Sequence, residues 1–318
     1  MTNPQHFRED DDITIALDDL RLVAAPYGAS LRGLEIIGSD GRSSDIATGY
    51  RGASNKIGGQ GDVLIPFPGR IAHGRYDFDG QTHQLVKNDE EGPSAIHGFV
   101  RSVFWEASTK SDRISFSTTI NETDHPGYPF ALEMEVTYRL DRGGMTVDMR
   151  ITNSGSRPAP VAAGFHPYFT VGSDLIDGDV LHVPFSKYLE FGDYFLPTGR
   201  VLDVAGSPID FRSPRVIGDV PINTCYLDPQ RDSDGLARVR LSNPSGQKSV
   251  TIWLDKGFDY VVLYSGEALE EQHRRRSLAI EAMTCASDAF NHPDWGLLSL
   301  APGQTVSASW GVDVSELR

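Results

Sequence analysis

Short β-type runs separated by turn residues follow one another along this whole chain, and they constrain its fold more than any other feature. The runs are rich in Val, Ile, Leu, Tyr, Phe and Thr, and Gly, Pro, Asn and Asp bound them. Many short strands at regular spacing are typical of antiparallel β-proteins. We predict strands at Ile13–Leu17, Leu20–Ala24, Ser30–Ile37, Arg113–Thr119, Leu132–Leu140, Met145–Thr152, Ala159–Ala163, Leu236–Leu241, Ser249–Leu254, Tyr260–Tyr264 and Val306–Val312.

Helical periodicity is scarce in the same sequence. The best helical candidate is the short segment Ser287–Phe290, and the irregular segment Gly172–Asp219 predicts long loops over one face. We find no internal repeat, low-complexity tract or linker. With 318 residues the chain is long enough for one large core. The sequence therefore predicts an all-β fold, a large antiparallel β-sandwich with few short helices, as a single domain over residues 1–318.

Charge and hydropathy exclude several classes of partner. The net charge is −15, whereas nucleic-acid binding and attachment to anionic lipid need a basic surface. The N-terminus is polar and acidic, and no window is apolar enough to span a membrane. The two cysteines have no metal-ligand spacing. We expect a cytoplasmic protein with no nucleic-acid or membrane partner, and its oligomeric state stays open between monomer and homodimer.

The stretch Gly58–Trp105 concentrates turn residues around two polar side chains. A short apolar strand, Val63–Ile65, leads into the rigid turn Pro66–Gly69, which presents Arg70. A polar loop further on runs into Ala-Ile-His-Gly-Phe-Val-Arg, which contains His97. Because functional side chains are often delivered by loops on a rigid scaffold, Arg70 and His97 are candidate site residues.

Two further polar residues lie in apolar surroundings. Glu281 follows Leu-Ala-Ile at the end of a predicted strand, and His166 lies in Gly-Phe-His-Pro-Tyr-Phe. A buried carboxylate must be paired or have a raised pKa, and both conditions cluster at functional sites. The structural alternatives are a buried ion pair between Glu281 and an arginine, and a hydrogen-bonded core histidine at 166.

These residue types suit proton transfer without a cofactor. A carboxylate base and a histidine acid can move protons on a neutral polyhydroxylated substrate. Two histidines and a glutamate could also bind a metal ion, but the sequence has no HxH or HExxH spacing. We therefore expect neither a metal nor a cofactor.

Six segments in order carry a family resemblance: LIPFPGRIAHGRYDFDG, AIHGFVR, HPGYPFALEMEVTYRL, GFHPYF, IEAMTCASDAFN and LAPGQTVSASWGV. They span Leu64 to Val312, and the chain resembles the aldose 1-epimerase (galactose mutarotase-like) family. The resemblance implies a large antiparallel β-sandwich that interconverts the α and β anomers of an aldose by opening and reclosing the sugar ring.

The resemblance also implies residue roles. Glu281 would be the base that takes the proton of the C1 hydroxyl, and His166 the acid that protonates the ring oxygen. His97 would hydrogen-bond near the ring oxygen, and Arg70 would bind sugar hydroxyls. Tyr168, beside His166, is a candidate for stacking on a sugar face.

The sequence departs from the family pattern at two positions. Gly69 stands where the family usually has Asn, and Asn223 stands where it often has a sugar-binding Asp. An amide donates to and accepts from hydroxyls but carries no charge, so Asn223 remains a candidate substrate-binding residue while the preference between glucose and galactose stays open.

Three alternatives stay open beside this reading. The first is a non-catalytic sugar-binding or sensing protein on the same fold, and the second is a metal-dependent sugar isomerase or hydrolase. The third is a mutarotase for phosphorylated or sulfonated sugars, which the basic run His273–Arg276 could recognise.

Overall fold

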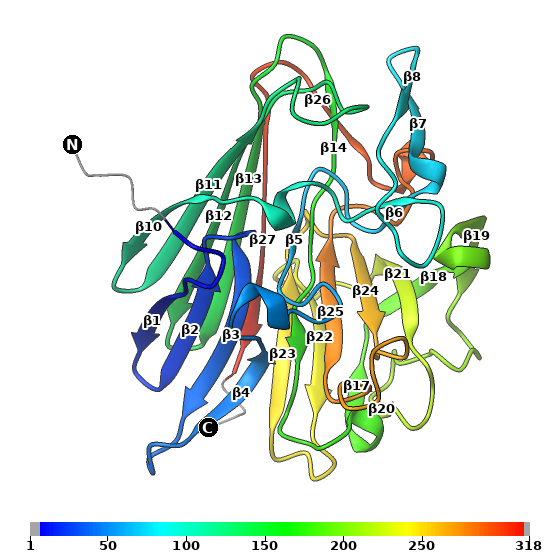
Figure 1. Cartoon of the computed structure of the whole chain (residues 1–318). Helices are drawn as coiled ribbons and strands as arrows, with labels where there is room; N and C mark the ends of the chain where they lie inside the picture. The colour runs from blue at the N-terminus through cyan, green and yellow to red at the C-terminus, as the bar shows by residue number, and fades with distance from the viewer. Residues whose placement is uncertain (1–6, 315–318) are drawn as a thin grey trace.

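Two large antiparallel sheets form the body of the computed structural model, which describes residues 7–314 (Figure 1). The first, twelve-stranded sheet has the order β1 (Ile13–Leu17), β2 (Leu20–Ala25), β3 (Ser30–Ile37), β4 (Ser43–Thr48), β16 (Tyr168–Phe169), β25 (Leu278–Met283), β24 (Tyr260–Tyr264), β21 (Asn223–Pro229), β18 (Phe185–Phe191) and β19 (Pro197–Asp203), with β15 (Gly164–Phe165) paired to β25 and to β5 (Val63–Leu64).

The second, nine-stranded sheet has the order β10 (Glu106–Lys110), β11 (Arg113–Ile120), β12 (Leu132–Asp141), β13 (Gly144–Asn153), β27 (Thr305–Asp313), β23 (Ser249–Leu254), β22 (Ala237–Ser242), β17 (Val180–His182) and β20 (Arg215–Val216). The described residues also contain three two-stranded sheets: β14 (Ala159–Val161) with β26 (Leu298–Leu300), β6 (Arg70–Ile71) with β9 (Ala95–Ile96), and β7 (Arg75–Phe78) with β8 (Gln81–Gln84).

Alternation along the strands builds the core between the sheets. In β12 every second residue is buried, from Leu132 to Leu140, while the residues between them face outward. Such a period of two places all the apolar side chains on one face. The two sheets meet where the ring of Phe165 lies 5.5 Å from that of Trp310. The hydroxyl of Tyr138 in the second sheet donates to the carbonyl of Ala29, just before β3. The predicted β-sandwich is therefore confirmed.

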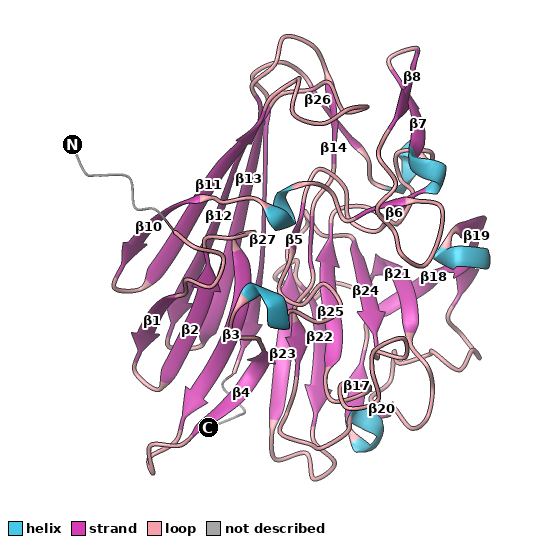
Figure 2. Ribbon diagram, in the orientation of Figure 1, coloured by secondary structure: helices cyan, strands magenta, loops and turns pink. Residues whose placement is uncertain are grey.

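Helical structure within residues 7–314 is limited to short 3₁₀ turns (Figure 2). They are η1 (Ala53–Asn55), η2 (Ala72–Gly74), η3 (Val100–Ser102), η4 (Ile176–Gly178), η5 (Asp193–Phe195) and η6 (Pro293–Trp295). None of the described helices is long and apolar enough to cross a membrane.

Two sequence predictions about local structure are wrong. Ser287–Phe290 is a turn and not a helix. Its Asp288 has a left-handed backbone, and its amide and carboxylate bond to the backbone of β6 and η2, which replaces helical bonding. The segment Gly172–Asp219 is not a run of loops, because it contains β17 to β20. Phe185 and Leu189 of β18 are buried, and this strand extends the twelve-stranded sheet beyond β21.

Candidate active site

A cleft of about 840 Å³ opens over strands β25, β24, β21 and β18 of the twelve-stranded sheet. Its floor comes from these strands, and its walls come from the segments around β6 and β9 and from the loop that follows β24. The cleft brings together five of the six residues that the sequence proposed: Arg70, His97, His166, Asn223 and Glu281.

Glu281 and His166 form a buried pair at the bottom of this cleft. Oε1 of Glu281 lies 3.4 Å from Nε2 of His166, and the two residues are only 2% and 6% exposed. Burial raises the pKa of Glu281 well above its ordinary value, and the charge of Arg70 only partly opposes this. Burial also lowers the pKa of His166 to about 4. Both shifts favour the uncharged form of each side chain, in which the pair holds one titratable proton, on Glu281.

The local sequence explains why a carboxylate is buried here. All six residues of β25 are buried, so Glu281 occupies a strand that packs on both faces. Its Oε2 has no hydrogen-bond partner among the described residues, and neither has Nδ1 of His166. Unsatisfied buried polar atoms are uncommon in folded proteins and need an explanation. Oε2 of Glu281 therefore has hydrogen-bonding capacity that no described group uses.

A glycine-rich segment holds His166 in place. The His166 backbone donates to the carbonyl of Asp62 and accepts from the amide of Gly61, at 3.0 and 2.9 Å. Gly59 passes so close that a Cβ there would lie 3.0 Å from the imidazole. The absence of a side chain at Gly59 lets the backbone cover one side of the ring.

His97 presents a defined tautomer to the cleft. Its Nδ1 accepts the backbone N–H of Gly69 at 3.2 Å, which assigns the proton of the neutral ring to Nε2. Burial lowers the pKa of His97 well below its ordinary value, and the neighbouring His166 and Arg101 add to the effect. His97 and Gly98 both have left-handed backbones, and a Cβ at Gly98 would lie 2.1 Å from the carbonyl oxygen of Ile65. His97 is therefore a rigidly held neutral donor.

Arg70 is oriented by two acidic residues that the sequence analysis did not single out. Its Nε donates to Asp89 at 2.7 Å and one Nη to Glu91 at 2.5 Å. The guanidinium also lies 5.1 Å from the ring centre of Phe195. The run Asn-Asp-Glu-Glu-Gly after β8 was the available signal for these carboxylates, but nothing in that run indicates which arginine they bind.

Asn223 and Tyr168 occupy different positions relative to the cleft. Asn223 begins β21, is partly exposed on the floor, and pairs in register with Tyr264. Tyr168 does not line the cleft, because its ring stacks behind His166 at 5.3 Å and its hydroxyl donates to the carbonyl of Gly58 at 2.9 Å. From this position the ring of Tyr168 packs against His166, outside the described lining of the cleft.

A buried ion cluster lies next to the histidines. The carboxylate of Asp62 contacts Lys56 at 2.9 Å and Arg101 at 3.5 Å. Burial raises the pKa of Asp62 against the effect of these two cations. Arg101 lines the cleft and lowers the pKa of both His97 and His166. It ends the segment Ala-Ile-His-Gly-Phe-Val-Arg, but it was not proposed as a site residue.

The basic run His273–Arg276 lies outside the residues that line the cleft. Arg275 forms ion pairs with Asp177 and Glu267, and Arg274 donates to the carbonyl of Leu269. These arginines hold the surrounding loops together.

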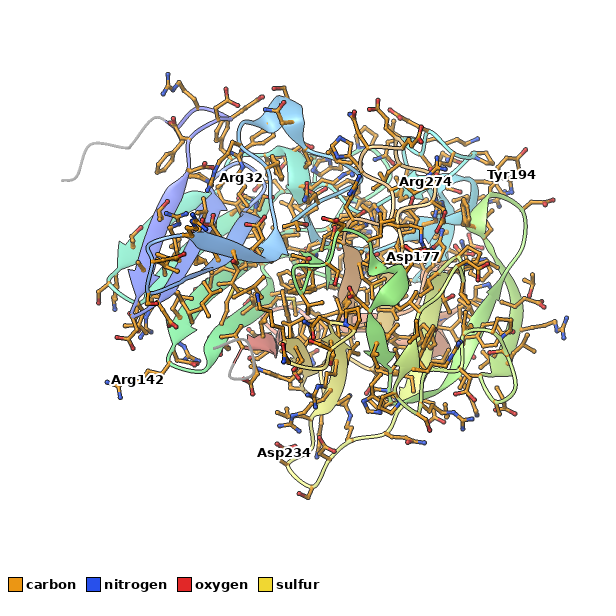
Figure 3. The ribbon with its side chains drawn as sticks, turned by 90° about the horizontal axis from the view of Figure 1, so that it is seen from below. Arg32, Arg142, Asp177, Tyr194, Asp234 and Arg274 are labelled. Atoms are coloured by element: carbon orange, nitrogen blue, oxygen red, sulfur yellow. The ribbon has the colours of Figure 1, made fainter. Side chains whose placement is uncertain are left out.

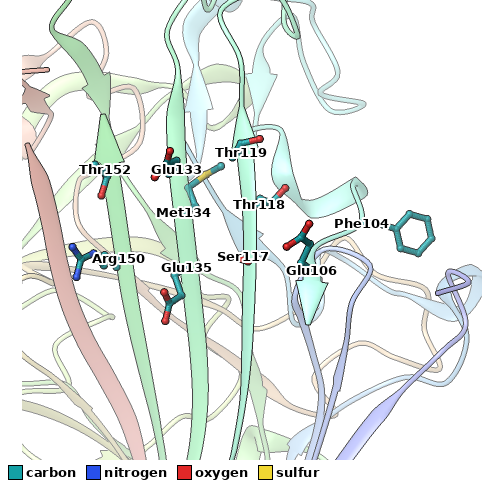
Figure 4. Close-up of a pocket in the computed structure, with 10 residues that line it drawn as sticks. All are labelled: Phe104, Glu106, Ser117, Thr118, Thr119, Glu133, Met134, Glu135, Arg150 and Thr152. Carbon is teal, nitrogen blue, oxygen red and sulfur yellow. The ribbon is translucent and has the colours of Figure 1, made fainter. Parts of the chain in front are cut away.

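A second hollow, of about 450 Å³, lies over β10 to β13 on the other sheet (Figure 4). It is lined by outward-facing strand residues such as Ser117, Glu133, Glu135 and Arg150, and its described lining contains no histidine. It therefore lacks the paired acid and base of the first cleft.

Gly69 offers a test of the turn that presents Arg70. Its backbone is left-handed, and a Cβ would lie 2.9 Å from the Ser287 Oγ that accepts the Arg70 N–H. We expect Gly69→Ala to lower the free energy of unfolding by about 1–3 kcal/mol in urea denaturation. Gly80→Ala is the matched control, because Gly80 is also left-handed but a Cβ there would have no neighbouring atom within 4 Å. Equal losses in both variants would show that the contact with Ser287 is unimportant.

The fold and the site define an antiparallel β-sandwich with a deep acid–base pair in an open cleft. Comparison with known proteins identifies the family: the sequence model of the aldose 1-epimerases matches residues 11–312, and the chain belongs to this family of isomerases. The resemblance seen in the sequence is confirmed.

The individual relatives share about a quarter to a third of the aligned residues with this chain. The chain is 28% identical to the uncharacterized protein YihR of Escherichia coli (strain K12), over 88% of this chain and 85% of that protein. It is 33% identical to the galactose mutarotase of Pongo abelii, over 63% of this chain and 60% of that protein. It is 29% identical to the maltose epimerase of Levilactobacillus brevis, over 75% and 74%. A GalM/aldose epimerase homologue from C. elegans has the same fold, with a TM-score of 0.85, 23% identity, and coverage of 96% of this chain and 98% of that one.

Proposed function

We propose that this protein interconverts the α and β anomers of a neutral aldose, with Glu281 as the base and His166 as the acid. The observation that carries the proposal is the buried contact of 3.4 Å between the two groups, at the bottom of a cleft large enough for a sugar. A general acid and a general base within hydrogen-bond reach of one substrate can each contribute about 10²- to 10⁴-fold to the rate.

The proposed reaction needs no external proton. The proton of the neutral Glu281 first passes to His166 across the contact of 3.4 Å, which leaves a carboxylate beside an imidazolium. Glu281 then removes the proton of the C1 hydroxyl, the bond between C1 and the ring oxygen breaks, and His166 gives its proton to that oxygen. The free aldehyde rotates about the bond between C1 and C2. Reclosure on the other face reverses both transfers, so Glu281 returns its proton to the C1 oxygen and His166 regains one from the ring-closing hydroxyl.

The other polar residues of the cleft assist in distinct ways. The Nε2–H of His97 can donate to the ring oxygen without bringing a charge of its own. Arg70 and Asn223 line the cleft and can hydrogen-bond to sugar hydroxyls. Because Asp89 and Glu91 already hold Arg70, its guanidinium is fixed before the substrate arrives.

The charges of the cleft favour a neutral aldose over an anionic one. Both arginines in the lining have carboxylate partners, since Arg70 pairs with Asp89 and Glu91 and Arg101 pairs with Asp62. Glu90 also lines the cleft and adds further negative charge. A sugar phosphate or sulfonate would meet repulsion there. Among residues 7–314, no three His, Cys, Asp or Glu side chains are grouped as a metal site.

Anomer exchange measured by NMR with glucose and galactose tests the proposal, and its pH dependence follows from the buried pair. The active form holds one proton in total, shared by Glu281 and His166. Below about pH 4 His166 becomes protonated while Glu281 is still neutral, and activity falls. Above the raised pKa of Glu281 the pair loses its last proton, and activity falls again.

We therefore expect a bell-shaped profile of kcat/KM, with an acid limb near pH 4 and an alkaline limb well above the ordinary glutamate pKa. No acceleration with any aldose, in a folded protein that still binds sugar, would favour the non-catalytic sugar-binding alternative. A profile with no alkaline limb would contradict the shared proton.

A further inference from the structure

We propose that the cleft contains a second sugar-binding subsite, formed by Phe191 and Phe195, which takes the non-reducing unit of a disaccharide whose reducing unit lies at Glu281. This inference rests on the proposed function, because it places the reacting sugar at the acid–base pair. It names the substrate class as neutral reducing disaccharides.

The first argument is the length of the cleft. Glu281 lies on β25 and Phe191 at the end of β18, with β24 and β21 between them in the sheet. Three strand spacings separate them by roughly 14 Å. A single pyranose ring held at Glu281 cannot also cover Phe191. A second, linked ring reaches that distance.

The second argument is the size and nature of the far end. The cleft volume of about 840 Å³ lies in the upper part of the range of roughly 300–1,000 Å³ that binds drug-sized ligands. A hexose is smaller than such ligands, whereas a disaccharide is of that size. Phe191 and Phe195 are partly exposed in the lining, and aromatic rings offer apolar faces to the C–H faces of sugars.

The third argument is that Phe195 is held in position by an unusual backbone. Tyr194 and Phe195 are consecutive residues with left-handed φ angles of 56° and 55°. Tyr194 turns outward at the edge of the molecule and is 56% exposed (Figure 3). Phe195 turns the other way, over Arg70 at 5.1 Å.

A contact from the opposite wall fixes the same turn. Gly92 passes so close to Tyr194 that a Cβ at residue 92 would lie 2.7 Å from that side chain. Left-handed backbone at non-glycine residues is unfavourable and tends to persist at ligand-binding positions. The turn between β18 and β19 thus builds an aromatic platform before any ligand binds.

The test compares a hexose with disaccharides of that hexose. KM for anomer exchange is measured with glucose, maltose and cellobiose in the wild type, in Phe195→Ala and in Phe191→Ala. We expect at least one disaccharide to have a lower KM than glucose in the wild type. Each variant should raise that KM by about threefold to tenfold, the size of an aromatic contact. Phe191→Ala should leave the KM for glucose within about twofold, and Phe195→Ala should raise the KM of the disaccharide more than that of glucose.

Two controls separate the subsite from a structural role of the rings. Phe195→Tyr keeps the aromatic face and should retain the low disaccharide KM. Phe104→Ala removes a phenyl ring that is 46% exposed beside the second hollow, and it should change neither KM (Figure 4). If Phe195→Ala raises the KM of glucose and of the disaccharides equally, the ring only supports Arg70 and the subsite is refuted.

A binding measurement distinguishes failure of the subsite from failure of the proposed function. The methyl glycosides of maltose and cellobiose cannot open their rings, so their binding, followed by saturation-transfer NMR, does not depend on catalysis. Binding to the wild type that is weakened in Phe195→Ala and in Phe191→Ala supports the subsite even if no aldose is turned over. Absence of binding by both glycosides, together with equal KM values for glucose and both disaccharides, overturns it.

Discussion

Glu281→Gln should lower kcat for anomer exchange by about a thousandfold, because the amide keeps the shape of the side chain but cannot accept the proton of the C1 hydroxyl. The fold should be little affected. Burial raises the pKa of Glu281 and so favours its neutral form, which the amide of Gln resembles in charge and shape. Polarimetry or NMR exchange gives the rate, and thermal unfolding gives the stability.

Glu133→Gln is a suitable control for the loss of a carboxyl group elsewhere, since Glu133 lies exposed over the second hollow. It should leave the rate unchanged. A loss smaller than about tenfold in Glu281→Gln would be too small for a general base and would remove Glu281 from that role.

His166→Asn should lower kcat by about 10²- to 10³-fold and should also change the shape of the pH profile. The acid limb near pH 4 belongs to His166, so it should disappear from whatever activity remains. A variant that only perturbed packing would keep this limb at reduced amplitude. The measurement is therefore kcat/KM across the acid range, with His73→Asn as an exposed-histidine control.

The double variant Glu281→Gln/His166→Asn tests whether the two residues act on the same step. If Glu281 and His166 act on one substrate as a unit, removing both should reduce the rate little beyond the slower single variant, because residues that act together are strongly non-additive. Multiplicative losses would instead mean that the two residues contribute to separate steps.

Several of the long strands could be predicted because their buried and exposed residues alternate. In β12 alternation alone gives the correct segment and the correct inward residues. Strand β18 was missed because only Phe185 and Leu189 are buried in it, while Lys187 and Glu190 interrupt the apolar pattern. Its stability comes from pairing with β21 and β19, which no local window contains.

The site was predictable where polar residues interrupt apolar runs, as at Glu281 and His166. It was not predictable where contacts between distant segments set the position of a side chain. Examples are the ion pair between Asp89 and Arg70 and the left-handed turn at Phe195. Tyr168 was expected to stack on a sugar face, and in the structure its ring stacks on His166 outside the described lining of the cleft. In a strand of two residues such as β16, the sequence does not reveal which face each side chain occupies.

The cleft draws its polar groups from separate segments, with Arg70 and His97 in the first third of the chain, His166 near the middle and Glu281 near the end. Contacts between such distant segments form slowly, because the chain loses the entropy of closing a long loop before the contacts can stabilise it. A partly folded chain therefore holds the parts of an epimerase but no place where a sugar could react. The cleft is therefore complete only when these distant segments have come together in the folded chain.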